Sequence, residues 1–282
     1  MEGLPPPIDY LVVGHVTQDL TPAGPVTGGT VTYSGLTARA LGLRTGIVTS
    51  AAGGNLPPEL ADFPAACLPA EHTTTFENIY SRDARTQWLR AIAAPLTLDA
   101  IPPAWRSTPI VHLGPLAQEF DSALTGAFPG SFVGLTPQGW LRRWEGDGRV
   151  LPTAWRGAEA ALAAASAVVI GQDDIERNED IVQAWAQIAR LLVVTSGAGG
   201  ATVYQHGNRW HFPAPVVEEI DPTGAGDIFA AVFFAHLQSG GDSAAAAEAA
   251  VQVASRSVER PGIEGTPRPE EVRGLVPRGR IA

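Results

Sequence analysis

One short segment of the chain combines a glycine-rich turn with a carboxylate at the expected start of a helix. It precedes the apolar stretch Ile228–Leu237 and reads Asp221-Pro222-Thr223-Gly224-Ala225-Gly226-Asp227. The first backbone N–H groups of a helix have no partner within the helix, and the helix dipole adds positive potential there. Because no bulky side chain crowds this turn, a phosphate can approach those N–H groups closely. The segment therefore predicts an anion site.

Asp227 places a carboxylate in the first turn of that helix, beside a position that favours an anion. In one interpretation it only complements the helix dipole, which is common and needs no catalysis. In the other, Asp227 is a general base that takes a proton from a hydroxyl. The backbone amides of Gly224, Ala225 and Gly226 would then hold the charge that develops on a transferred phosphoryl group. The residues of this segment leave both interpretations open.

The composition excludes several other kinds of chemistry. All 19 basic residues among the 282 are Arg, so the chain has no P-loop lysine, no Schiff-base lysine and no Ser–Lys dyad. With 29 acidic residues the formal charge is −10, whereas nucleic-acid binders usually carry a basic excess. The single cysteine, Cys67, excludes an internal disulfide framework and any multi-cysteine zinc site. We expect a small-molecule partner and no nucleic acid.

No segment has the pattern of a signal peptide or a membrane span. The N-terminal residues lack a basic region followed by an apolar core. The longest apolar stretches without charge, 160–170 and 228–237, are shorter than the roughly 18–20 residues that cross a bilayer. We expect a cytoplasmic protein that does not contact a membrane.

Around these residues the sequence alternates short apolar strands with helices, which predicts a mainly parallel sheet in one α/β domain over residues 8–272, followed by a tail at 273–282. Two hairpins interrupt the alternation. One pairs 73–80 with 86–93 around the turn 81–85, and the other pairs 201–206 with 209–212 across Gly207-Asn208. The expected strands are 10–14, 45–49, 110–113, 132–135, 167–170 and 191–195, and the expected helices are 34–41, 155–165, 181–189, 224–237 and 243–257.

The motifs, taken in order, resemble the PfkB (ribokinase-like) carbohydrate kinase family over nearly the whole chain. The strongest match is the C-terminal signature, DPTGAGDIFAA from Asp221 onwards. Weaker matches are the first strand with its following acid (YLVVGHVTQD, ending at Asp19), the pair Gly28-Gly29, the nucleotide-loop pattern Thr195–Gly200, and Pro261-Gly262. The resemblance implies a three-layer α/β sandwich, with a small β lid formed by residues 16–30 and 73–93.

The same resemblance implies ATP-dependent phosphorylation of a sugar or polyol hydroxyl, with Mg²⁺ and, as a further candidate, K⁺. The expected assembly is a monomer or a homodimer joined through the lid. The implied residues are Asp227, Gly224, Ala225 and Gly226 for catalysis; Asp19, Gly28, Gly29, Tyr33 and Gln138 for the substrate; Thr195, Gly197, Gly200, Thr223, Pro261 and Gly262 for the nucleotide; and Glu176 and Asp173 for the metal.

Two departures from the family pattern bear on the substrate and the metal. Tyr33 stands where the family usually has an Asn that contacts the sugar, and Asp173 replaces the Asn of the N-x-x-E element. The segment Thr136–Arg142 resembles inositol-kinase-like members, and Gln138 or Arg142 in it is a candidate substrate contact. We therefore expect a cyclic polyol such as myo-inositol. The alternatives are a nucleoside or other sugar kinase, and a ligand-binding or regulatory protein without turnover.

Overall fold

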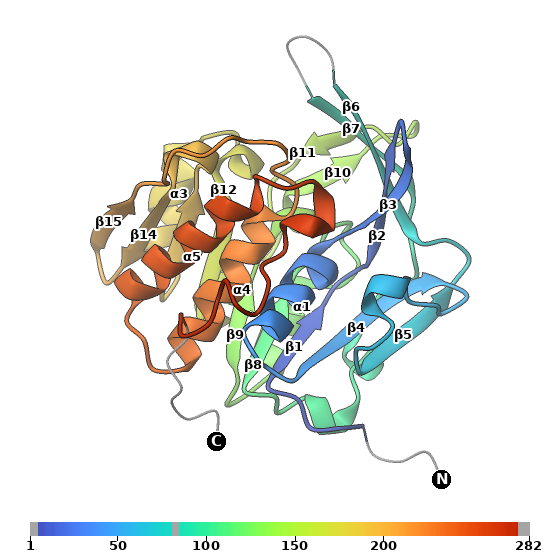
Figure 1. Ribbon diagram of the computed structural model, residues 1–282, viewed down its shortest axis with the longest axis horizontal. Coiled ribbons are helices and arrows are strands. Elements are labelled where there is room, and N and C mark those ends of the chain that lie inside the picture. Colours follow the sequence, from blue (N-terminus) through green and yellow to red (C-terminus); the bar gives the residue numbers. More distant parts are fainter. Residues whose placement is uncertain (1–4, 81–84, 276–282) are drawn as a thin grey trace.

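The computed structural model describes residues 5–80 and 85–275 and contains one large sheet that crosses the molecule (Figure 1). The strand order is β15-β14-β13-β12-β9-β8-β1-β4-β5. All neighbours from β13 to β5 are parallel, whereas β13–β14 and β14–β15 are antiparallel. The strands are β1 (Tyr10–Val13), β4 (Thr45–Ala52), β5 (Ala65–Ala70), β8 (Ile110–Leu113), β9 (Phe132–Leu135), β12 (Ala167–Gly171), β13 (Leu192–Thr195), β14 (Ala201–Gln205) and β15 (Asn208–Phe212).

Helices cover both faces of this sheet, and alternate strand residues supply the two cores. Tyr10 and Val12 of β1 belong to one core, while Leu11 and Val13 belong to the other. Figure 1 shows α1, α4 and α5 together in front of the sheet. The expected three-layer sandwich is therefore confirmed. The first core packs against α1 (Thr30–Ala40), α4 (Ala225–Gln238) and α5 (Ser243–Ser257), and the second against α2 (Ala158–Ala164) and α3 (Glu179–Ala186).

A second, four-stranded sheet forms the expected lid, with the order β3-β2-β6-β7. Its two hairpins join through a parallel β2–β6 pair in which Asp19 lies opposite Phe76. These strands fall within the expected lid segments, 16–30 and 73–93, although most of the expected turn, residues 81–84, lies outside the described residues. The lid strands are β2 (Thr17–Thr21), β3 (Gly24–Gly28), β6 (Thr74–Tyr80) and β7 (Arg85–Ala91).

The sequence did not predict two pairings. A hairpin of β10 (Arg142–Trp144) and β11 (Val150–Pro152) follows β9 and touches the lid, where Leu89 N donates to Gly148 O at 2.8 Å. The second is the pairing of β5 with β4. Strand β5 carries Pro69, which lowers strand propensity but is tolerated at the edge of a sheet.

One expected turn also needs correction. Gln205 pairs with Asn208, so His206-Gly207, not Gly207-Asn208, connects β14 to β15.

Helix α1 begins at Thr30, four residues before the expected start. Its first residues, Thr30-Val31-Thr32, are β-branched and have low helix propensity. The helix forms there because its first turn is buried against α4 and the sheet, and because Thr32 Oγ1 donates to Gly28 O at 2.7 Å. Tertiary packing thus overrides local propensity at the place where the lid meets the main domain.

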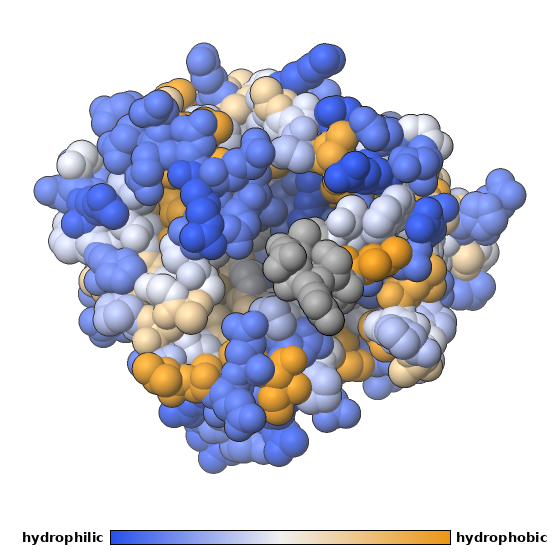
Figure 2. Space-filling view, turned by 90° about the horizontal axis from the view of Figure 1, so that it is seen from above, coloured by the Kyte–Doolittle hydropathy of each residue, from blue (hydrophilic) through white to orange (hydrophobic). Residues whose placement is uncertain are grey.

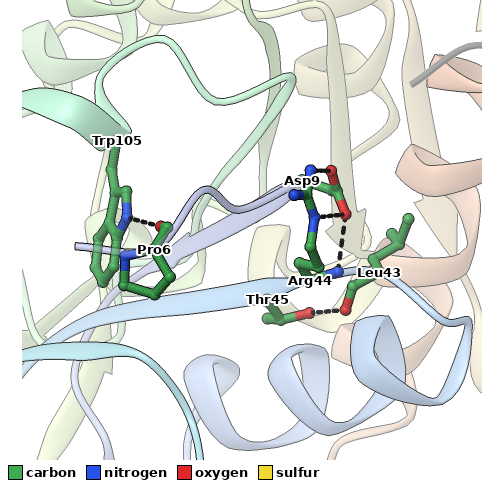
Figure 3. Close-up of polar contacts among 6 residues, drawn as sticks. All are labelled: Pro6, Asp9, Leu43, Arg44, Thr45 and Trp105. Atoms are coloured by element: carbon green, nitrogen blue, oxygen red, sulfur yellow. Dashed lines mark hydrogen bonds and ion pairs between the residues drawn. The ribbon is translucent and has the colours of Figure 1, made fainter. Parts of the chain in front are cut away.

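Polar contacts fix the amino ends of β1 and β4, at the far end of the sheet from the lid (Figure 3). Arg44 donates its Nε and its backbone N to Asp9 Oδ2, at 2.9 and 3.0 Å. These hydrogen bonds hold the pKa of Asp9 below its usual value. The Trp105 indole also donates to Pro6 O at 3.0 Å and anchors the segment before β1. No helix among the described residues is long and apolar enough to cross a membrane.

Candidate active site

The expected site residues gather at the carboxyl edge of the parallel strands, where open α/β sheets bind ligands. The loops after β1, β9 and β12 end there, and α1 and α4 begin there. Figure 2 looks onto this end of the molecule and shows a depression bordered mainly by hydrophilic residues. The lid hairpins rise beside it in Figure 1.

The glycine turn before α4 is held from two sides. Gly224 has a φ of 80°, and a Cβ at this position would overlap the ring of Tyr33. Asp221 Oδ1 accepts from Thr223 N at 2.9 Å, and its Oδ2 accepts from Gly262 N at 2.8 Å. Asp221 therefore fastens the turn to the loop before the 3-10 turn Gly262–Gly265, which brings two of the expected nucleotide residues together.

Asp227 is partly buried in the first turn of α4, and its pKa is raised to about 6. Burial is the largest cause. A hydrogen bond from the Thr30 side chain opposes it, the charge of Asp174 adds to it, and the charge of Arg142 also opposes it. Ser34 Oγ donates to the backbone oxygen of Asp227 at 3.0 Å. A carboxyl with this pKa is ionised at neutral pH and still basic enough to accept a proton, as a general base requires.

On the lid side, Asp19 lies over Gly28. A Cβ at Gly28 would overlap the Asp19 carboxylate, so only glycine leaves room for it. Gly29 has a φ of 93° and turns the chain from the lid into α1. Burial, followed by the charges of Asp19, Asp221 and Asp227, raises the pKa of Tyr33. The acid of the lid and the two acids of the α4 segment are therefore all close enough to Tyr33 to act on it.

Tyr33 differs from the expectation that it contacts the substrate. The side chain is only 2% exposed, and its ring packs against Gly224. It has almost no surface to offer a ligand. The ring instead supports the glycine turn before α4.

Gln138 lies in a polar cluster with Arg142 and Asp174. Gln138 Nε2 donates to Asp174 Oδ1 at 2.9 Å, and Arg142 Nη2 lies 3.5 Å from the same oxygen. The cluster joins the loop after β9 to the loop after β12. It is also close enough to Asp227 for both of its charges to act on that carboxyl.

The two residues expected to bind the metal lie on the loop after β12, but neither is the acid beside Asp227. Asp173 is exposed and accepts from Arg177 Nε at 2.9 Å, and Glu176 is exposed with a φ of 51°. The acid that acts on Asp227 is Asp174. No group of three or more His, Cys, Asp or Glu side chains in the described part of the chain could hold a metal ion by itself.

The expected nucleotide loop follows β13. Thr195 ends the strand, and Gly197–Gly199 form a 3-10 turn. Gly200 has a φ of 88°, and a Cβ there would overlap Phe212 O. Glycine at position 200 is therefore explained by close packing on β15, whether or not a nucleotide binds.

Sequence reasoning missed two residues that act on Asp227, Thr30 and Asp174. Thr30 follows the glycine pair directly, and Asp174 directly follows Asp173. Their only sequence signal was a polar side chain just after a turn or strand. His15, just after β1, is fully buried, with its ring hydrogen-bonded to Thr74 and Ala94.

Comparison with known proteins finds a family whose pattern matches the part of the chain that contains this turn. A model of the pfkB family carbohydrate kinases matches residues 151–270, which contain the turn at Gly224 and Asp227. This part of the chain has the pattern of a PfkB carbohydrate kinase. The protein is a phosphotransferase with an alcohol group as acceptor.

Curated relatives of the chain include enzymes with different acceptors. It is 26% identical to the cytidine kinase of Thermococcus kodakarensis over 265 residues, which cover 83% of this chain and 90% of that protein. It is 31% identical to a fructokinase of Escherichia coli over 156 residues, which cover 49% of each chain.

Solved structures share the fold. A pyrophosphate-dependent kinase in the ribokinase family, complexed with a pyrophosphate analog and myo-inositol, has a TM-score of 0.77 and 22% identity, covering 93% of this chain and 98% of its own. The ribokinase of Arabidopsis thaliana, complexed with ribose and ATP, has a TM-score of 0.72 and 18% identity, covering 96% and 99%. At these identities the similarity shows a ribokinase-like fold.

Proposed function

We propose that this protein transfers a phosphoryl group from ATP to a hydroxyl of a cyclic polyol, with myo-inositol as the first candidate. The observation that carries the proposal is the position of Asp227. It is a partly buried carboxyl with a pKa raised to about 6, at the start of the helix whose glycine turn forms the anion site. A residue that only complemented a helix dipole would need neither the burial nor the surrounding hydrogen bonds.

In this mechanism the acceptor binds between Asp19 of the lid and Asp227 of α4. Asp19 accepts hydrogen bonds from acceptor hydroxyls, and Asp227 takes the proton from the hydroxyl that attacks phosphorus. The backbone N–H groups of Gly224, Ala225 and Gly226 stabilise the charge on the phosphoryl oxygens. The closed lid excludes water, which limits hydrolysis of the donor.

The residues on the loop after β12 fit a Mg²⁺ that is bound mainly through phosphates. Mg²⁺ usually takes one or two carboxylates together with substrate phosphates and waters. Asp173 and Glu176 are exposed carboxylates on this loop. When bound there with the donor, Mg²⁺ would neutralise phosphate charge. The nucleotide role of Thr195, Gly197, Gly200, Thr223, Pro261 and Gly262 and the use of K⁺ belong to the same proposal.

The choice of a cyclic polyol is supported by the segment Thr136–Arg142 and by the similar structure that contains myo-inositol. Tyr33 does not support this choice, because its side chain is buried. The cytidine kinase similarity, which extends over 83% of the chain, makes a nucleoside the second candidate acceptor.

A turnover screen tests both the donor and the acceptor. Purified protein is incubated with ATP or pyrophosphate and with myo-inositol, ribose, fructose, fructose 6-phosphate, cytidine or adenosine, and product formation is measured. We expect myo-inositol with ATP to have the highest kcat/KM. A lead of about tenfold for another acceptor, a difference of about 1.4 kcal/mol, would overturn the polyol assignment. No turnover with any pair would support a binding protein.

A further inference from the structure

A mostly buried basic side chain, Arg142, pairs with an acid on the loop after β12. Arg142 is the first residue of β10, and its side chain is 19% exposed. Its Nη2 atom lies 3.5 Å from Oδ1 of Asp174, whose side chain is 18% exposed. Asp174 Oδ1 also accepts from Gln138 Nε2 at 2.9 Å. Charged groups with so little exposure are rare unless they are paired or functional.

The backbone that carries Arg142 is firmly held. Arg142 pairs with Pro152 in the β10–β11 hairpin, and its backbone oxygen accepts from the side-chain amide of Gln118. Thr153 N donates to Leu141 O at 2.8 Å, one residue before. The guanidinium is therefore presented by a rigid element that is separate from α4, which carries Asp227.

The charge of Arg142 reaches the reaction centre, since it acts on the carboxyl of Asp227 and lowers its pKa. The chain has no lysine, so a permanently charged side chain in the site must be arginine. A planar guanidinium matches the oxygens of a phosphoryl group. An arginine that contacts a transferring phosphoryl group can contribute about 10³–10⁵ in rate in other phosphotransferases.

We propose that Arg142 is a catalytic residue whose guanidinium contacts an oxygen of the transferring phosphoryl group, with Asp174 and Gln138 as positioning residues. The inference rests on the proposed function. The acceptor oxygen forms its bond to phosphorus, the bond from phosphorus to the donor oxygen breaks, and its electron pair leaves with the donor. Asp227 takes the acceptor proton, whereas Arg142 stays protonated throughout and only stabilises charge.

The competing explanation is that Arg142 merely pairs with Asp174 to join two loops. The two explanations differ in what each substitution does. If the pair is only structural, Arg142→Gln and Asp174→Asn break the same contact and should lower kcat equally. If Arg142 contacts the phosphoryl group, Asp174→Asn loosens its position, but Arg142→Gln removes the contact itself.

The experiment measures kcat, both KM values and the melting temperature for wild type, Arg142→Gln, Arg142→Lys, Asp174→Asn and Arg143→Gln. Arg143 is the matched control, because its side chain is 53% exposed on the same strand. We expect Arg142→Gln to lower kcat about 10²- to 10³-fold, the usual cost of one lost charge-stabilising donor. Because the contact forms in the transition state, acceptor KM should change by less than about threefold.

Arg142→Lys, which keeps the charge, should recover part of the lost kcat, and Arg143→Gln should stay within about twofold of wild type. Asp174→Asn should be at least about tenfold more active than Arg142→Gln. Equal losses in these two variants, or an Arg142→Gln kcat within about threefold of wild type, would overturn the inference and leave the kinase assignment intact. A wild-type protein without turnover would instead overturn the proposed function, and the inference with it.

Discussion

Asp227 is the residue on which the proposed chemistry depends most. Asp227→Asn preserves the shape of the side chain but removes the ability to accept a proton. We expect kcat to fall about 10²- to 10⁴-fold, the usual contribution of a general base. The ionised carboxylate is disfavoured by burial, so the wild type loses stability as pH rises through about 6. The melting temperature of the variant at pH 7.5 should therefore equal or exceed that of the wild type.

If the purified Asn variant kept more than about a tenth of the wild-type kcat, Asp227 would not be the base. A lowered melting temperature at pH 7.5 would indicate that the carboxylate stabilises the fold. Calorimetry measures donor binding by the same variant separately, so a loss of donor binding can be distinguished from either result.

The pH dependence of kcat/KM follows from the same carboxyl. Four groups or effects set its pKa near 6: burial, the Thr30 hydroxyl, Asp174 and Arg142. The base works only when ionised, so activity should be full well above pH 6 and should fall about tenfold per pH unit well below it. Steady-state rates between pH 5 and pH 8 at fixed donor test this. A midpoint near the ordinary aspartate value of about 4 would contradict the role of burial.

We expect Asp19 to act on the acceptor only, because it belongs to the lid and not to the glycine turn. Asp19→Ala should raise acceptor KM by about tenfold to a hundredfold, the cost of roughly 1.5–3 kcal/mol for a charged hydrogen-bond partner. Donor KM should change little. Gln18→Ala is the control, because Gln18 is its exposed neighbour on the same strand. Equal increases in both KM values would instead assign Asp19 a general structural role.

At the scale of elements, the start of α4 and the start of α1 depend on each other through one contact. Tyr33 of α1 packs against Gly224. This glycine has a φ of 80°, and there is no room for a Cβ at its position. Gly224→Ala should displace the turn and lower kcat by at least about 10²-fold, since small misplacements at a reaction centre have effects of this size. The backbone strain alone costs about 1–3 kcal/mol of stability.

Gly240→Ala separates the two effects of the Gly224 substitution. Gly240 lies just beyond the other end of α4, has a φ of 91°, and has no atom within 4 Å of a built Cβ. Its substitution should lower the melting temperature but leave kcat within about twofold. If Gly224→Ala lowered stability without lowering kcat, the turn would not form the anion site.

At the scale of the whole molecule, His15 connects the end of β1 in the main sheet to the β6–β7 hairpin of the lid. Its Nε2 lies 2.9 Å from Ala94 O, a carbonyl that can only accept, so Nε2 carries the proton. Its Nδ1 is hydrogen-bonded to Thr74 Oγ1 at 2.7 Å, and that oxygen accepts from Ala93 N at 2.9 Å. The ring thus fixes the beginning of β6 and the end of the lid hairpin next to β1.

His15→Phe should loosen the lid without removing any group from the reaction centre. Two buried hydrogen bonds are lost, at about 1–3 kcal/mol for each group left unpaired. We expect faster amide exchange in β2, β6 and β7, and a larger ratio of donor hydrolysis to transfer, because a loosened lid admits water. His72→Phe is the control, because the His72 side chain is 61% exposed just before β6. Unchanged exchange in the lid would contradict this role.

The sequence by itself determined the elements and the chemistry that arise from neighbouring residues. Asp227 and the turn at Gly224 could be predicted because the free N–H groups of a helix start are a local property. The apolar strands and the lid segments could be predicted for the same reason, since their patterns repeat within a few residues. The exact start of α1 could not, because packing on α4 overrode the low propensity of Thr30-Val31-Thr32.

Only the tertiary structure decided which side chains surround the base. Thr30, Asp174 and Arg142 are far from Asp227 in the sequence, and they meet it because neighbouring parallel strands end at one edge of the sheet. The same long-range packing turned Tyr33 from a candidate substrate contact into a support for the glycine turn. Electrostatic effects and burial depend on distances between such segments, and those distances are set by the fold as a whole and not by any local pattern.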